Sequence, residues 1–216
     1  MAEPSIIYLD PEADATLQIG KDEAREFHVS SKTLALASPY FAALFGPNFK
    51  EGIATRSGEK PCIALEDDDP GAMDTILKAL HHQCADIPLE MELKELVQIA
   101  IHCDKYDCIK AMKPWTGNWC RFPQAGADSP QKMEDIGLAL LAACLLRSAN
   151  FETMTVHATK HLAGDFASIW ANHDQLARIP EKLKATLVGG GNSHNGLLII
   201  HASYLLQDEN RRISHH

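Results

Sequence analysis

Histidine and cysteine side chains that could bind a metal ion gather at two places in the sequence. They are His81, His82 and Cys84 at the first place, and His102, Cys103 and Cys108 at the second. Zinc could join such groups across a fold, but neither group has the paired spacing of common structural zinc sites. His102 and Cys103 are also adjacent, so on a helix they cannot face the same way. The sequence therefore gives little support for zinc, and we expect no metal ion or other cofactor.

Motifs of common enzyme sites do not occur in the sequence. It has no Gly-x-Ser-x-Gly nucleophile elbow, and the glycines at 189–191 are not followed by the Lys-Ser/Thr pair of a phosphate-binding loop. The acidic run at 66–69 lacks the pattern of a calcium-binding loop, so we predict a solvated turn there. An unrecognised site that uses His157, His161 or His173 stays open as an alternative. We nevertheless expect that the protein is not an enzyme.

Composition excludes further classes of function. The 216 residues include 20 Lys and Arg against 29 Asp and Glu, a net charge of −9, which disfavours binding to nucleic acid through bulk charge. The longest apolar stretch, at 136–146, is far shorter than the roughly 18 residues that span a bilayer. The first residues do not resemble a secretory leader. We therefore expect a soluble protein of the cytoplasm or nucleus, without nucleic-acid or membrane partners.

The elements that must position any site begin with a predicted β-hairpin over residues 15–29, where polar and apolar residues alternate. Ser30 is a suitable cap for a short helix after the hairpin. Ser38 and Pro39 then start a second helix, because serine caps helices well and proline suits the first helical position. We expect this second helix to stop at Gly46.

A strand and three longer helices are predicted next. The strand covers residues 61–65, and Asp69 caps a helix whose apolar stripe runs from residue 73 to 80. A similar stripe at 93–101 predicts a second helix, and residues 108–119 a third. Beyond a predicted linker at 121–131, which contains two prolines and no periodic pattern, only helices are expected. These helices lie at 136–147, 151–161, 166–170, 175–187 and 196–206.

The segment from residue 27 to 45 resembles the central run of BTB/POZ domains. The residues that carry the resemblance are Phe27, Val29, Leu34, Leu36, Ser38, Pro39, Phe41, Leu44 and Phe45. Two further matches are the segment 48–51 and the Ala-x-x-x-Asp-Lys-Tyr sequence within 100–107. The resemblance implies an α+β fold, in which a small β-sheet is flanked by a cluster of helices and followed by an all-α C-terminal extension. We expect Leu34, Leu36, Phe41, Leu44 and Phe45 to lie in the core first and at an interface second.

The resemblance also predicts how the chain is divided. We expect an N-terminal segment at 1–12, a BTB/POZ domain at 13–120, the linker at 121–131 and a helical C-terminal region at 132–216. This layout is similar to that of short fungal BTB proteins with a helical extension. One departure concerns residues 81–88, which lack the aromatic-rich segment that the family places after its first long helix, so the strand usually found there is in doubt.

The resemblance implies protein–protein interaction. BTB domains commonly form homodimers, and many bind cullin-3 and thereby recruit a client protein to a ubiquitin ligase. Members that bind cullin carry a hydrophobic-x-Glu motif, which Phe49, Lys50 and Glu51 match in this sequence. Phe49 would then be an apolar anchor and Glu51 a polar contact at its rim, although Phe49 could instead pack beside Phe45. The alternative function is a self-associating structural or transcription-related protein that binds no cullin.

Overall fold

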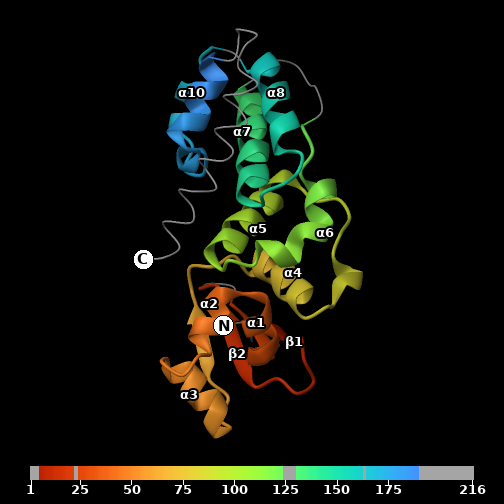
Figure 1. Ribbon diagram of the computed structural model, residues 1–216, viewed down its shortest axis with the longest axis vertical. Helices are drawn as coiled ribbons and strands as arrows, with labels where there is room; N and C mark the ends of the chain where they lie inside the picture. The colour runs from red at the N-terminus through yellow and green to blue at the C-terminus, as the bar shows by residue number, and fades with distance from the viewer. Residues whose placement is uncertain (1–4, 22–23, 124–129, 163, 190–216) are drawn as a thin grey trace. The chain divides into compact units, whose positions relative to one another are not determined.

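The structure is a computed structural model that describes residues 5–21, 24–123, 130–162 and 164–189 (Figure 1). The chain divides into two compact units, Met1–Trp115 and Thr116–His216, which we describe separately. This division falls inside a helix, α6 (Ile109–Trp119). Part of the predicted linker at 121–131 lies outside the described residues, and that boundary stays a prediction.

A four-stranded sheet in the order β1-β3-β2-β4 forms one layer of the first unit. Strands β2 (Ala15–Ile19) and β3 (Arg25–Val29) form the predicted antiparallel hairpin, with Ala15 opposite Val29. Strand β4 (Cys62–Leu65), also predicted, runs parallel to β2. Leu17 and Phe27 face each other across the hairpin and are fully buried, so this face of the sheet lies in the core.

The edge strand β1 (Ser5–Tyr8) was not predicted, since residues 1–12 were assigned only to an N-terminal segment. It runs parallel to β3, with Ser5 opposite Arg25. A parallel partner is joined through a long connection rather than a tight turn, so no local turn pattern marks this pairing in the sequence.

The first unit contains several helices, and three of them begin directly after a predicted cap. The helices are α1 (Ser31–Ala37), α2 (Pro39–Leu44), α3 (Lys50–Ser57), α4 (Pro70–Leu80), the 3₁₀ helix η1 (Cys84–Asp86), α5 (Leu93–Lys105) and α6. The side chains of Ser30, Ser38 and Asp69 each accept a hydrogen bond from a backbone N–H three residues later. Helix α3 was not predicted. Among the described residues 81–92, η1 takes the place where the family usually has a strand.

Burial separates the residues of the BTB-like run. Phe27, Val29, Leu34, Ser38, Phe41 and Phe45 are buried, as expected for a core. Leu36 is 82% exposed, so its assignment to the core is wrong. It lies two residues after Leu34, or about 200° around the helix, so α1 cannot bury both side chains against one neighbour. Leu44 is half-buried and Pro39 is exposed.

The second unit is helical in its described part. Its helices are α7 (Pro130–Leu145), α8 (Phe151–His161), α9 (Phe166–Ala171), the 3₁₀ helix η2 (Leu176–Arg178) and α10 (Glu181–Gly189). The indole N–H of the buried Trp170 donates to the carbonyl oxygen of Met133 at 2.9 Å, which joins α9 to α7. The single helix predicted at 175–187 is wrong. Pro180 forces Ile179 into an extended conformation and so separates η2 from α10. The helix predicted at 196–206 lies outside the described residues.

Candidate protein-interaction site

Large apolar side chains that remain exposed mark the surfaces of the first unit that could bind a protein. They are Ile6, Tyr8, Leu36, Tyr40, Phe49, Ile53 and Leu89. Single exposed apolar residues are common on soluble proteins, so only those held next to one another indicate a site. Two sets meet this condition, one on α3 and one at the N-terminal edge of the sheet.

The α3 surface consists of Phe49, which precedes the helix, and Ile53. The backbone N–H of Ile53 donates to the carbonyl oxygen of Phe49 at 3.1 Å, so the two residues are one helical turn apart. Phe49 is 49% exposed and Ile53 is 57% exposed, whereas Phe45 is buried. Phe49 is therefore not enclosed in the core beside Phe45, and the two side chains present an apolar ridge to solvent.

A close backbone contact fixes helix α3 against the end of α2. Gly52 is buried, and a Cβ atom at this position would lie 2.0 Å from the carbonyl oxygen of Gly46. The Arg56 guanidinium, one turn later, donates to the same carbonyl oxygen at 3.1 Å. Only glycine allows the helix to approach so closely. The contacts with Gly46 therefore fix the position of helix α3, which presents the α3 surface.

The remaining residues of the predicted motif differ in exposure. The Lys50 side chain is 93% exposed, and its Nζ lies 3.8 Å from Oε1 of Glu51. The Glu51 side chain is only 14% exposed. A carboxylate covered to this extent has less surface available to a partner than Phe49 has. The exposed surface of this site is therefore mainly apolar.

The second exposed set lies at the N-terminal edge of the sheet. Ile6 and Tyr8 are two residues apart on β1 and therefore share one face of the strand. The Tyr8 ring stacks on His28 of the neighbouring strand with the ring centroids 4.5 Å apart. This stacking holds Tyr8 in place although it is 65% exposed.

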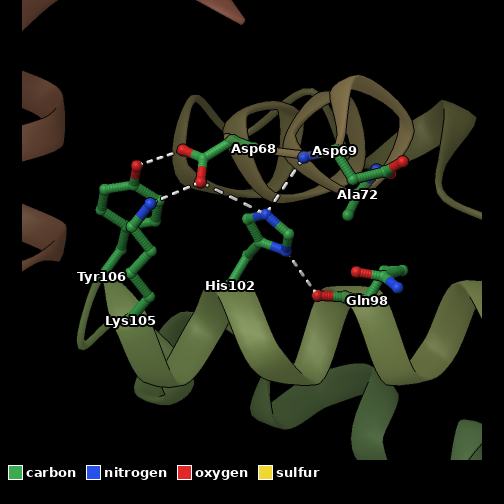
Figure 2. A network of polar contacts seen from close by, with 7 residues as sticks. All are labelled: Asp68, Asp69, Ala72, Gln98, His102, Lys105 and Tyr106. Atoms are coloured by element: carbon green, nitrogen blue, oxygen red, sulfur yellow. Dashed lines mark hydrogen bonds and ion pairs between the residues drawn. The ribbon is translucent and has the colours of Figure 1, made fainter. Parts of the chain in front are cut away.

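The first unit also contains a buried polar network centred on Asp68 (Figure 2). Lys105 Nζ donates to Oδ1 of Asp68 at 2.6 Å, and the Tyr106 hydroxyl donates to Oδ2. His102 Nε2 lies 3.4 Å from Oδ1 of Asp68 and 3.1 Å from the backbone nitrogen of Asp69. These contacts join the turn before α4 to the last two turns of α5.

Charge and burial set the protonation of this network. Burial alone would raise the pKa of Asp68, but the hydrogen bonds from His102, Lys105 and Tyr106 outweigh it and lower the pKa from 3.8 to about 2. Burial lowers the pKa of His102, but the bonds to Asp68 and to the Gln98 carbonyl outweigh it and raise that pKa above 6.5. Asp68 is therefore ionised at neutral pH.

The sequence did not predict this network, and the expectation that Asp68 lies in a solvated turn is wrong. Asp68 is 4% exposed. Its neighbours in the acidic run, Glu66 and Asp67, are exposed as predicted. The available hint was the segment 100–107, which supplies His102, Lys105 and Tyr106, but nothing in either segment alone pairs the two.

The network also reaches the helices that carry the BTB-like run. The Ser38 hydroxyl, which caps α2, donates to the carbonyl oxygen of Tyr106 at 2.6 Å. The Phe41 ring stacks on the Tyr106 ring with centroids 5.1 Å apart, and Tyr40 meets that ring edge-on at 4.9 Å. The position of α2 is therefore coupled to the end of α5 through polar and aromatic contacts.

Two further observations bear on the chemistry of the chain. Within the ranges that the structure describes, no three or more His, Cys, Asp or Glu side chains are grouped so as to hold a metal ion. None of the described helices combines the length and the apolar character that crossing a bilayer requires. The described part of the first unit therefore combines an exposed apolar surface on α3 with a buried polar network.

Comparison with protein-family models identifies the domain in the first part of the chain. The family model of the BTB/POZ domain matches residues 10–114. A search of curated proteins finds no match. The matched range covers the sheet from β2 onward, helices α1 to α5, both partners of the buried network and the α3 surface. BTB/POZ domains are protein–protein interaction modules that associate with themselves or with other proteins. This chain is a BTB/POZ domain-containing protein whose interaction module is followed by further helices.

Proposed function

We propose that this protein is a homodimeric adaptor that recruits a client protein to a cullin-based ubiquitin ligase. The observation that carries the proposal is the exposure of Phe49, at the position of the family's cullin-binding motif, beside the exposed Ile53 one helical turn later. A half-exposed phenylalanine on a fixed helix is the kind of residue that fills a partner's pocket and contributes most of the binding energy. The adaptor would work in the cytoplasm or nucleus.

Glu51 would have a smaller part in this interaction. Its side chain is largely covered by its own domain and lies near Lys50. We infer that its contribution is to orient the start of α3, together with the bond from the Thr55 hydroxyl to the Glu51 carbonyl oxygen at 2.7 Å. The helical region at 132–216 would carry the surface for the client.

Calorimetric titration of the full chain with the N-terminal domain of cullin-3 tests the proposal. We expect saturable binding that Phe49→Ala weakens about 30-fold, since truncation of a central anchor costs about 2 kcal/mol. Val188→Ala is the matched control, because Val188 is also an exposed apolar side chain, at 66%, but belongs to the other unit. Absence of binding by the folded wild-type chain would overturn the adaptor proposal.

The alternative is a self-associating BTB protein that binds no cullin, and the exposed apolar side chains of Ile6 and Tyr8 on β1 and of Leu36 on α1 favour it. Burial of such side chains between two copies would remove apolar surface from water. The molar masses of the wild type and of Leu36→Glu, measured by light scattering, test this proposed interface between two copies of the chain. A dimer that Leu36→Glu converts to a monomer, combined with no cullin binding, would select the alternative.

A further inference from the structure

Helix α8 of the second unit carries two histidines with the spacing of a metal-binding pair. His157 and His161 are four residues apart and both are exposed. Residues at this spacing lie next to each other on one face of a helix, with their Cβ atoms about 5–6 Å apart. Two imidazoles at this distance can reach the same ion, as they do in zinc sites built on one helix.

Phe122 holds both imidazole rings. Its ring centroid lies 5.4 Å from that of His157 and 5.6 Å from that of His161, with the planes tilted by 52° and 40°. A phenyl ring in contact with both imidazoles restricts their rotation. Metal ligation uses the nitrogen atoms at the edge of each imidazole ring, and both histidines are exposed.

The nitrogen atoms of this pair are not engaged elsewhere in the described part of the chain. No described residue forms a hydrogen bond or ion pair with either imidazole. This differs from His81 and His102, whose ring nitrogens both have partners. Two exposed imidazoles one helical turn apart, without hydrogen-bond partners among the described residues, are thus available as ligands.

We propose that His157 and His161 together bind one divalent late first-row transition-metal ion. Imidazole suits Cu²⁺, Ni²⁺ and Zn²⁺, and the affinity should be highest for Cu²⁺. No third protein ligand accompanies the pair in the described ranges. Water therefore fills the other coordination positions, and the ion exchanges with solvent. The site is independent of the proposed interaction of the BTB/POZ domain.

Calorimetric titration with Cu²⁺ tests the site. The parent is the full chain with His215→Ser and His216→Ser, which removes the adjacent histidines at the C-terminus. The test variant exchanges two neighbours, Val156→His with His157→Val, so that the histidine count is kept and the spacing becomes five residues. Val156 is 39% exposed, so the exchange leaves the core unchanged. We expect at least about ten-fold weaker binding, because the second imidazole no longer binds as an intramolecular ligand.

A matched control and a spectroscopic measurement complete the test. His173→Ala removes one histidine elsewhere in the same unit and should leave the affinity unchanged. Electron paramagnetic resonance of the copper-loaded parent should show two imidazole nitrogens, and His161→Gln should show one. This second variant also serves if the exchange variant fails to fold. The proposal would be overturned if the parent and the folded exchange variant, whose histidines are five residues apart, bound copper with equal affinity. It would also be overturned if the spectrum of the parent showed only one imidazole nitrogen.

Discussion

The two ends of helix α4 are each held by a histidine, and the two histidines make the same local bond. His81, which follows α4, directs its Nδ1 at the Leu77 carbonyl oxygen at 2.8 Å, and His102 directs its Nδ1 at the Gln98 carbonyl oxygen at 2.7 Å. Each Nε2 meets a backbone N–H from a distant segment, that of Ser30 in one case and Asp69 in the other, both at 3.1 Å.

The two sites differ in what lies beside the ring. His102 has the Asp68 carboxylate 3.4 Å from its Nε2, and its pKa is raised. For His81, burial lowers the pKa below 6.5, and the helix carbonyl and the more distant Asp10 only partly offset this effect. The two histidines therefore share this hydrogen-bonding geometry but have pKa values shifted in opposite directions, and the deciding factor is one nearby carboxylate.

Removal of that carboxylate should have the largest effect. We expect Asp68→Asn to lower the free energy of unfolding by about 3 kcal/mol, because it breaks a buried ionic network while His102 and Tyr106 stay in place. Urea denaturation at pH 7 measures the change. The control is Asp67→Asn in the exposed neighbour, which should change stability by less than about 0.5 kcal/mol. Equal effects at both positions would contradict the role of Asp68.

Acid should reproduce part of this effect in the wild-type chain. The pKa of Asp68 is lowered to about 2 in the folded state, compared with 3.8 when unfolded. A lowered pKa contributes stability that is complete above the unfolded value and is lost as the pH falls toward the folded value. We therefore expect about 2 kcal/mol to be lost between about pH 4 and pH 2. Denaturation curves of the wild type and Asp68→Asn across this range should converge, and parallel curves would contradict the assignment.

The same contrast explains which features could be predicted from the sequence. The helix caps Ser30, Ser38 and Asp69 were predicted correctly because a cap bonds to a backbone group three residues away. Asp68 was placed wrongly because its partner Lys105 lies 37 residues further along the chain. A local pattern of acidic residues indicates solvation, and only the packing of α4 on α5 shows that one of them is buried.

The candidate interaction site also has features that the sequence predicted and features that depend on tertiary packing. The segment containing Phe49 could be selected from the resemblance, but its partner Ile53 could not, since α3 itself was not predicted. The close approach of Gly52 to Gly46 that fixes this helix is a tertiary contact without a sequence pattern. Leu36 was assigned to the core through the family run, whereas its exposure depends on which face of α1 meets the domain.

The smallest expected effect separates the two histidines themselves. The neutral form of His81 accepts a bond from Ser30, so its contribution is present above pH 6.5 and is lost as the pH falls through its lowered folded-state pKa. His102 has a raised pKa, so its contribution is complete below pH 6.5 and is lost as the pH rises through the folded-state value. We expect His81→Asn to lower the free energy of unfolding by about 1 kcal/mol at pH 8 and by less at pH 5. The loss caused by His102→Asn should change with pH in the opposite direction.

His82→Asn is the control, because His82 is exposed and asparagine tolerates its positive φ of 61°. Proton NMR titration of the imidazole resonances in the wild type, assigned from the variants, should place the pKa of His81 below that of His102, and the reverse order would show that the carboxylate does not decide the difference.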